Sequence, residues 1–139
     1  MDLITDRVEA DVLLGNSKGQ YGFADLNRVE AAVEHLQEQV KALDINLGLI
    51  TKTDWGIPGG FSSNTWPTES QMRRYLKNVA LLCQSLGLQD YLPAAMAGLT
   101  WEGANALERA LINVQARITA TVGAFHYSGE VFAGEENIL

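Results

Sequence analysis

The sequence predicts a mainly α fold: an antiparallel bundle of three long helices, preceded by a short helix and followed by a short extended or β-hairpin arm. Three stretches place apolar residues alternately three and four positions apart, which is the spacing of one buried face on an α-helix. These residues are Leu26, Val29, Val33, Leu36, Val40 and Leu43; Met72, Tyr75, Val79, Leu82 and Leu86; and Ala104, Leu107, Leu111, Val114 and Ile118. Three such faces can bury one another within a single chain, and 139 residues suit one domain.

The first segment, residues 1–22, is expected to hold a short helix and a turn. Thr5 or Asp6 can cap the start of a helix over residues 5–14. Gly15 can adopt the left-handed conformation that ends it. A turn-rich stretch then leads to the bundle.

The bundle is predicted over residues 23–125. Its first long helix is expected from about Phe23 to Leu43. The second has a clear start, because Thr68 and Gln71 have the spacing of a capping box, and we expect it to end at residue 87. The third is expected from about residue 100 to residue 125.

A loop of about twenty residues, 48–67, is predicted between the first two long helices, because helical periodicity is replaced there by Gly, Pro, Ser and Asn. Trp55, Phe61 and Trp66 lie in it. Aromatic side chains are costly to leave in water, so they either cover the bundle or face a partner. We favour the internal cover.

The last segment, residues 126–139, is predicted to be an extended arm. Tyr127, Val131 and Phe132, with a Ser-Gly pair between them, are typical of a short strand or tight hairpin. Such an element is too short to be stable without support, so it must lean on the bundle or on another subunit.

Composition limits the classes of partner. Ten basic and seventeen acidic residues give a net charge of -7, which opposes binding to nucleic acid. No apolar run is long enough to span a membrane, and the N-terminus lacks the pattern of a Sec signal. The single cysteine, Cys83, is expected to be a buried structural thiol.

The sequence offers no constellation for catalysis. His35 and His126 have no recognisable partner, and no spacing of His, Cys, Asp or Glu is typical of a metal site. The glutamates show no pair held at a fixed separation. We therefore expect no enzyme activity and no catalytic, metal-binding or cofactor-binding residues.

Several segments, in one order over most of the chain, resemble small helical structural proteins of the tail and baseplate modules of phages and prophages of Gram-positive bacteria. The segments are Ile4-Thr5-Asp6-Arg7, Ala10-Asp11-Val12, Tyr21, Asp25-Leu26-Asn27-Arg28-Val29-Glu30, Thr51-Lys52-Thr53-Asp54-Trp55, Pro67-Thr68, Arg74-Tyr75-Leu76, Leu99-Thr100-Trp101-Glu102-Gly103-Ala104-Asn105, Tyr127-Ser128-Gly129-Glu130 and Ala133-Gly134-Glu135. The resemblance implies a non-enzymatic component of the virion, at the tail tip, baseplate or fibres, assembled in the host cytoplasm. It implies other tail or baseplate subunits as partners, and the symmetry of tails would also suit a homo-oligomer.

Two functional hypotheses follow. The first is a structural adaptor whose terminal segments dock on neighbouring subunits, with Tyr127, Val131 and Phe132 as contacts. The alternative is a receptor- or carbohydrate-binding module that uses the aromatic residues of loop 48–67. The polar residues Arg28 and Asn105 are assigned a structural role and, if buried, should be paired.

Overall fold

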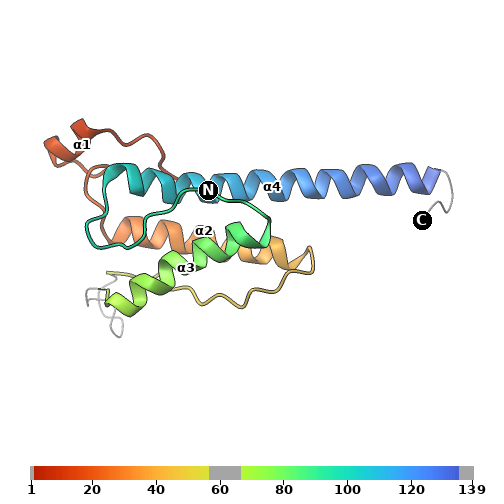
Figure 1. Cartoon of the computed structure of the whole chain (residues 1–139), viewed down its shortest axis with the longest axis horizontal. Helices are drawn as coiled ribbons and strands as arrows, with labels where there is room; N and C mark the ends of the chain where they lie inside the picture. The colour runs from red at the N-terminus through yellow and green to blue at the C-terminus, as the bar shows by residue number, and fades with distance from the viewer. Residues whose placement is uncertain (1, 57–66, 135–139) are drawn as a thin grey trace.

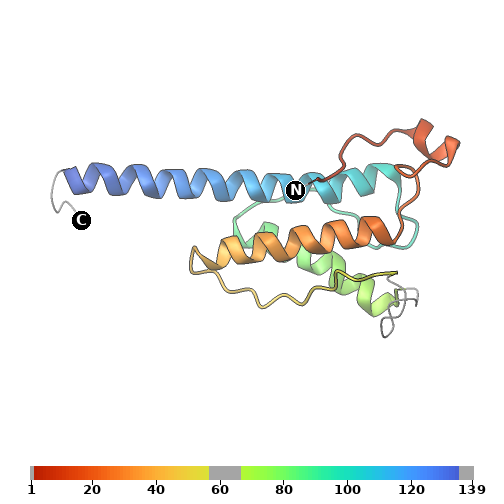
Figure 2. The ribbon, with the colours of Figure 1, turned by 180° about the vertical axis from the view of Figure 1, so that it is seen from behind.

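The computed structural model describes residues 2–56 and 67–134, with the backbone alone over 124–134, and its fold is mainly helical (Figures 1 and 2). The helices are α1 (Glu9–Leu14), α2 (Phe23–Lys41), α3 (Glu69–Ser85) and α4 (Trp101–Gly134). No strand occurs among the described residues. The helices α2, α3 and α4 contact one another in all three pairs, which confirms the predicted helical bundle.

The three long helices run in the same direction, so the predicted antiparallel arrangement is wrong. Arg28, near the start of α2, bonds Glu108 on α4, whereas Gln39, near its end, bonds Gln115 further along α4. Figure 1 shows α2, α3 and α4 all running from left to right. The reason lies in the two connections, 42–68 and 86–100, which are long enough to carry the chain back across the bundle.

The core is formed by the three apolar faces that the sequence predicts. Their buried members include Leu36 on α2, Leu82 on α3 and Leu111 on α4, and these pack in one cluster with Trp55. Cys83 is buried in the same cluster, which confirms the expected structural thiol. Burial raises the pKa of this thiol to about 11.

The described part of the connection after α2, residues 42–56, covers the core rather than forming an open loop. Every second residue of its return path, Ile45, Leu47 and Leu49, packs against the core. Its end is tied down at Gly56, whose φ is +73° and whose Cα lies so close to Phe23 that an added Cβ would meet that ring at 2.5 Å. Residues 57–66 lie outside the described part of the chain.

The helix starts follow local side-chain chemistry. Thr68 Oγ1 accepts a hydrogen bond from the Gln71 N–H at 3.2 Å, and Gln71 Oε1 accepts one from the Thr68 N–H at 2.8 Å, which confirms the predicted capping box. Gly15, with φ of +67°, ends α1 as expected. However, α1 begins at Glu9 and not at residue 5, because residues 4–7 are bonded to α4 instead.

The C-terminal half of α4 corrects the prediction of an extended or hairpin arm. Instead of ending near residue 125, α4 continues as a helix through Gly134. Extending a formed helix is easier than nucleating a new element, because each added residue gains a hydrogen bond without the initial entropy cost. Residues 135–139 lie outside the described part. Figure 1 shows this half of α4 extending past the ends of α2 and α3.

None of the helices in the described ranges is both long and apolar enough to cross a membrane.

Candidate functional site

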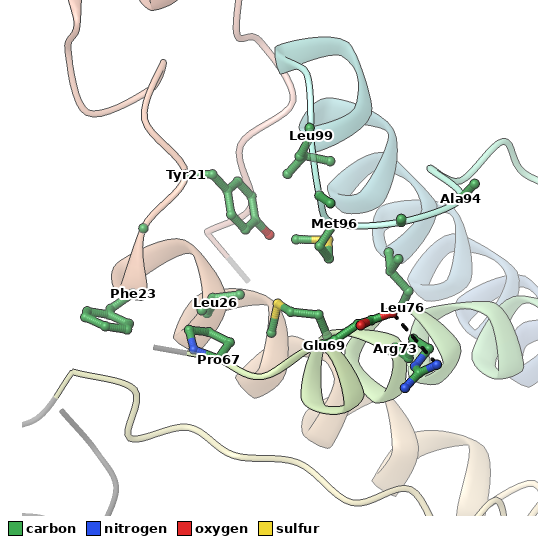
Figure 3. Close-up of a pocket in the computed structure, with 15 residues that line it drawn as sticks. Tyr21, Phe23, Leu26, Pro67, Glu69, Arg73, Leu76, Ala94, Met96 and Leu99 are labelled. Atoms are coloured by element: carbon green, nitrogen blue, oxygen red, sulfur yellow. Dashed lines mark ion pairs between the residues drawn. The ribbon is translucent and has the colours of Figure 1, made fainter. Parts of the chain in front are cut away.

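An apolar groove of about 890 Å³ opens where three segments meet: the start of α2, the start of α3 and the connection that leads into α4 (Figure 3). The lining residues are Tyr21, Gly22, Phe23, Leu26, Pro67, Glu69, Met72, Arg73, Leu76, Ala94, Ala95, Met96, Ala97, Gly98 and Leu99. Figure 3 shows Tyr21, Met96 and Leu99 on one side of the space and Leu26 and Pro67 on the other. We call this feature the α2–α3 groove.

The parallel direction of the helices creates the α2–α3 groove. It brings the starts of α2 and α3 to the same end of the bundle, and the connection 86–100 returns to that end before α4 begins. Met72 and Met96 line the groove from two different segments. Methionine side chains are flexible and polarisable, so such a surface adapts to apolar groups of different shape.

The charged residues of the α2–α3 groove are confined to one side. Of its lining residues, only Glu69 and Arg73 carry a full charge at neutral pH, and their side chains are mostly exposed. The pair is separated by 4.0 Å, one turn apart on α3, so it contributes little to stability. The rest of the lining fits apolar side chains better than a polar or charged substrate.

The hydroxyl of Tyr21 is not free for chemistry in the groove. It shares a hydrogen bond with the hydroxyl of Tyr75, which is buried in the core. Desolvation raises the pKa of both phenols well above the usual value, so both are neutral at physiological pH. The Arg7 guanidinium lies 5.6 Å from the centre of the Tyr21 ring.

A cluster of four charged residues, three of them buried and Arg28 half-buried, joins the N-terminal segment to α2 and α4; we call it the Glu108 cluster. Glu108 is 0% exposed, with Arg7 Nη2 at 2.6 Å from one carboxylate oxygen and Arg28 Nε at 2.7 Å from the other. Asp25 accepts from both arginines, at 3.2 Å and 2.6 Å. These hydrogen bonds, above all the one to Glu108, raise the pKa of Arg28. Two positive and two negative groups thus balance in the interior.

Asn105 fixes the N-terminal segment beside this cluster. Its side chain accepts a hydrogen bond from the Arg7 N–H at 3.1 Å and donates one to the Arg7 carbonyl at 2.9 Å. Asn105 is buried and Arg28 half-buried, and both are paired as the sequence analysis requires. Arg7 is 3% exposed, and its place in this cluster was not predicted from the sequence.

A second network, the Glu30 network, holds the return connection against α2 and α3. Glu30 Oε2 accepts from Trp55 Nε1 at 2.8 Å, and Arg74 bonds both Glu30 oxygens at 2.8 Å. Asn27 brackets the Trp55 backbone, donating to its carbonyl at 2.8 Å and accepting from its N–H at 2.7 Å. Trp55 is 1% exposed, so it is an internal cover residue.

Both networks are saturated. Within the part of the chain that the structure describes, every buried side-chain nitrogen and oxygen has a hydrogen-bond partner. Removal of one member would leave a buried charge uncompensated, which is strongly unfavourable. The two networks therefore fix the arrangement of the segments, and their charged groups are engaged with one another.

Of the six predicted contact residues, Trp55 is the one whose side chain the structure describes. Trp55 is buried in the core and is not among the residues that line the groove. Phe61 and Trp66 fall outside the described residues, and Tyr127, Val131 and Phe132 lie on the part of α4 described by its backbone alone. The groove itself was missed, although the apolar run from Ala94 to Leu99 lacks helical periodicity and could have signalled a packed connection.

No group of three or more potential His, Cys, Asp or Glu metal ligands is found among the residues described. His35 is exposed on α2 and bonds Gln39 on the next turn. Neither residue lies in the α2–α3 groove.

Comparison of the chain with protein-family models, with curated proteins and with solved structures finds no match.

Proposed function

We propose that this chain is a non-enzymatic structural protein of a phage tail or tail-like particle, an adaptor at the tail tip, baseplate or fibres that works through protein–protein contacts. The observation that carries this proposal is the α2–α3 groove, which is open, apolar and bordered by an exposed ion pair. The sequence resemblance supplies the setting: the tail region of the virion, after assembly in the host cytoplasm. Other tail or baseplate subunits are the partners.

The occupant that fits the groove is an apolar segment of a neighbouring subunit. A volume of about 890 Å³ holds a few side chains, such as those that one face of a short helix or an extended segment presents. Glu69 and Arg73 can pair with polar groups at the edge of that segment. By contrast, the buried charges of the Glu108 cluster and the Glu30 network are occupied within the fold.

The first test is to purify particles from a producing culture and to quantify this chain by mass spectrometry against the major tail proteins. A fixed stoichiometry is expected for a structural component. Absence from the particles would contradict the proposal and favour an assembly factor or a separate host-directed protein.

A matched pair of variants then tests the groove. Ala97 lines the groove and Ala31 lies elsewhere on α2, and both are exposed. Ala97→Glu should reduce incorporation into particles, because it places a charge on an apolar contact surface, whereas Ala31→Glu should be incorporated normally. Circular dichroism checks that both fold. Equal incorporation of the two variants would show that the groove is not the contact.

The C-terminal segment is a second candidate contact. Deletion of residues 126–139 should abolish incorporation and leave the bundle folded, since the side chains of α4 that pack in the described core, from Leu107 to Ile118, all precede the deleted segment. Retained incorporation of the shortened chain would remove this segment from the proposal.

A further inference from the structure

The bundle covers only the first half of α4. This helix has 34 residues and is about 51 Å long, whereas α2 and α3 have 19 and 17 residues. Among the side chains of α4 that the structure describes, through Gly123, the last buried one is Ile118, and Thr119, Ala120, Val122 and Gly123 are exposed. Figure 2 shows the remaining helix continuing alone beyond the bundle. We call residues 119–134 the projecting half.

The heptad pattern of α4 continues beyond the bundle, with aromatic residues at position a and small hydroxyl residues at position d. With Leu111 taken as position a of a heptad, position a recurs at Ile118, Phe125 and Phe132, and position d falls at Val114, Thr121 and Ser128. Leu111, Val114 and Ile118 pack against α2 and α3 in the core. The same helix face therefore continues an established interface into a region that none of the other described helices, α1 to α3, covers (Figure 2).

The intrinsic preference of the projecting half for helix is weak. Gly123 and Gly129 each cost about 1 kcal/mol relative to alanine, and isolated helices of about 15 residues are marginal in water. Packing of its apolar face against another helix would supply the missing stabilisation.

The charges of the projecting half do not oppose its pairing with a second copy of the chain. Heptad positions e and g, which select coiled-coil partners by their charges, are Val122, Ala124, Gly129 and Val131 in the projecting half. Its one acidic residue, Glu130, falls at position f, on the side away from the a and d positions. Two copies can thus approach along this face without like-charge repulsion, although the whole chain carries a net charge of -7.

An antiparallel pairing matches large side chains with small ones and leaves room for the second bundle. It sets position a of one copy against position d of the other, so Phe125 falls opposite Ser128 and Phe132 opposite Thr121, a large residue against a small one each time. It also places the second bundle beyond the free end of the first α4. A parallel neighbour would instead bring its own bundle against α2 and α3 of the first.

We propose that residues 119–134 of α4 pair antiparallel with the same residues of a second copy of this chain, forming a two-fold dimer with a bundle at each end. The interface is isologous, because each copy contributes the same face. It is about 25 Å long, so its affinity is modest and the dimer dissociates on dilution. The inference does not depend on a phage setting, since it rests on α4 alone.

Sedimentation velocity of the full chain, from about 1 µM to about 200 µM, tests this dimer. The chain should shift from monomer to dimer over this range. A monomer at every concentration, or an assembly larger than a dimer, would overturn the proposal.

Two glutamate variants locate the interface. Phe125→Glu, at position a, should remain monomeric throughout, whereas Gly123→Glu, at position f and exposed, should dimerise like the parent chain. Both variants leave the bundle residues unchanged, and circular dichroism verifies their fold. If both dimerise equally, the copies meet elsewhere and the inference fails.

Cysteine pairing tests the direction. A mixture of Phe125→Cys and Ser128→Cys chains should form disulfides between the two variants faster than either variant forms them alone. Faster pairing of Ser128→Cys with itself would indicate parallel helices and would contradict the antiparallel register. Cys83 does not interfere, because it is buried and its pKa is raised to about 11.

Discussion

The two halves of α4 share one apolar periodicity and differ in what covers it. From Ala104 to Ile118 the face is buried by α2 and α3, whereas Val122, the next apolar residue along it, is 50% exposed. The periodicity of a helix therefore shows where a partner is needed, and the connections of the chain decide whether that partner is internal. In this protein, Ile118 is the last residue of α4 that packs in the described core.

The polar residues sharpen this contrast. The packed half carries Asn105 and Glu108, which anchor the N-terminal segment and α2 through buried hydrogen bonds. The projecting half contains one carboxylate, Glu130. The first half thus specifies one arrangement of the chain, and the second half offers a face that a neighbouring molecule can use.

The largest effect is expected at Glu108. Glu108→Ala would remove the main acceptor of the buried Arg7 and the half-buried Arg28, so it should lower the free energy of unfolding by about 3–5 kcal/mol. Glu102→Ala, an exposed glutamate on the same helix, is the control and should change it by less than about 0.5 kcal/mol. Urea unfolding followed by circular dichroism gives both values, and a cost below about 1 kcal/mol for Glu108→Ala would refute the anchoring role.

Apolar truncations on either side of Ile118 test the comparison itself. Leu111 is 0% exposed, so Leu111→Ala should cost about 2–5 kcal/mol through lost burial and a cavity. In dilute, monomeric protein, Val122→Ala should cost less than about 0.5 kcal/mol. The same urea titration measures both, and similar costs would mean that the bundle covers more of α4 than we describe.

Alkaline pH should weaken the packed half through Cys83. Its pKa is 9.0 when exposed and about 11 in the fold, so between these values the unfolded state holds fewer protons. The free energy of unfolding should therefore fall as pH rises, by up to about 1.4 kcal/mol per pH unit. Urea titrations at pH 8, 9 and 10 measure the slope. Cys83→Ala should have a shallower slope, and an identical slope would exclude the thiol as the cause.

Glycine replacements should give the smallest difference. The Cβ added by Gly123→Ala meets no neighbouring atom within 4 Å. The substitution should therefore stabilise the helical state of the projecting half by up to about 1 kcal/mol. Gly103→Ala, near the start of α4, would place its Cβ 3.0 Å from Leu99 Cδ1 and should show no such gain. Amide hydrogen exchange along α4 measures the two effects. Increased protection in Gly103→Ala, with none in Gly123→Ala, would contradict this prediction.

The sequence predicts which residues face inward but not the direction of the helices that carry them. The spacing of residues such as Leu36, Leu82 and Leu111 has the same meaning whether neighbouring helices are parallel or antiparallel. The length of the connections bears on whether neighbouring helices are parallel. A twenty-residue segment can carry the chain back across the bundle, whereas a short turn cannot. The length of loop 48–67 carries this signal, but a long loop is also typical of a binding segment, so its length alone does not fix the direction of the helices.

The candidate site was harder to predict than the core. The α2–α3 groove combines residues from three segments, and it exists only because parallel helices bring their starts together. Arg7 was missed for a similar reason, since its acceptors Asp25 and Glu108 lie far away in the sequence. In contrast, the pairing of Asn105 follows from a general rule about buried polar groups and could be predicted.

The most direct test of the two-halves account is amide hydrogen exchange along α4 at low and at high protein concentration. The account predicts that residues 104–118 are protected equally at both concentrations, because the chain itself buries them, and that protection of 119–134 appears only at high concentration. Strong protection of 119–134 in the dilute monomer, or protection of 104–118 that depends on concentration, would contradict it.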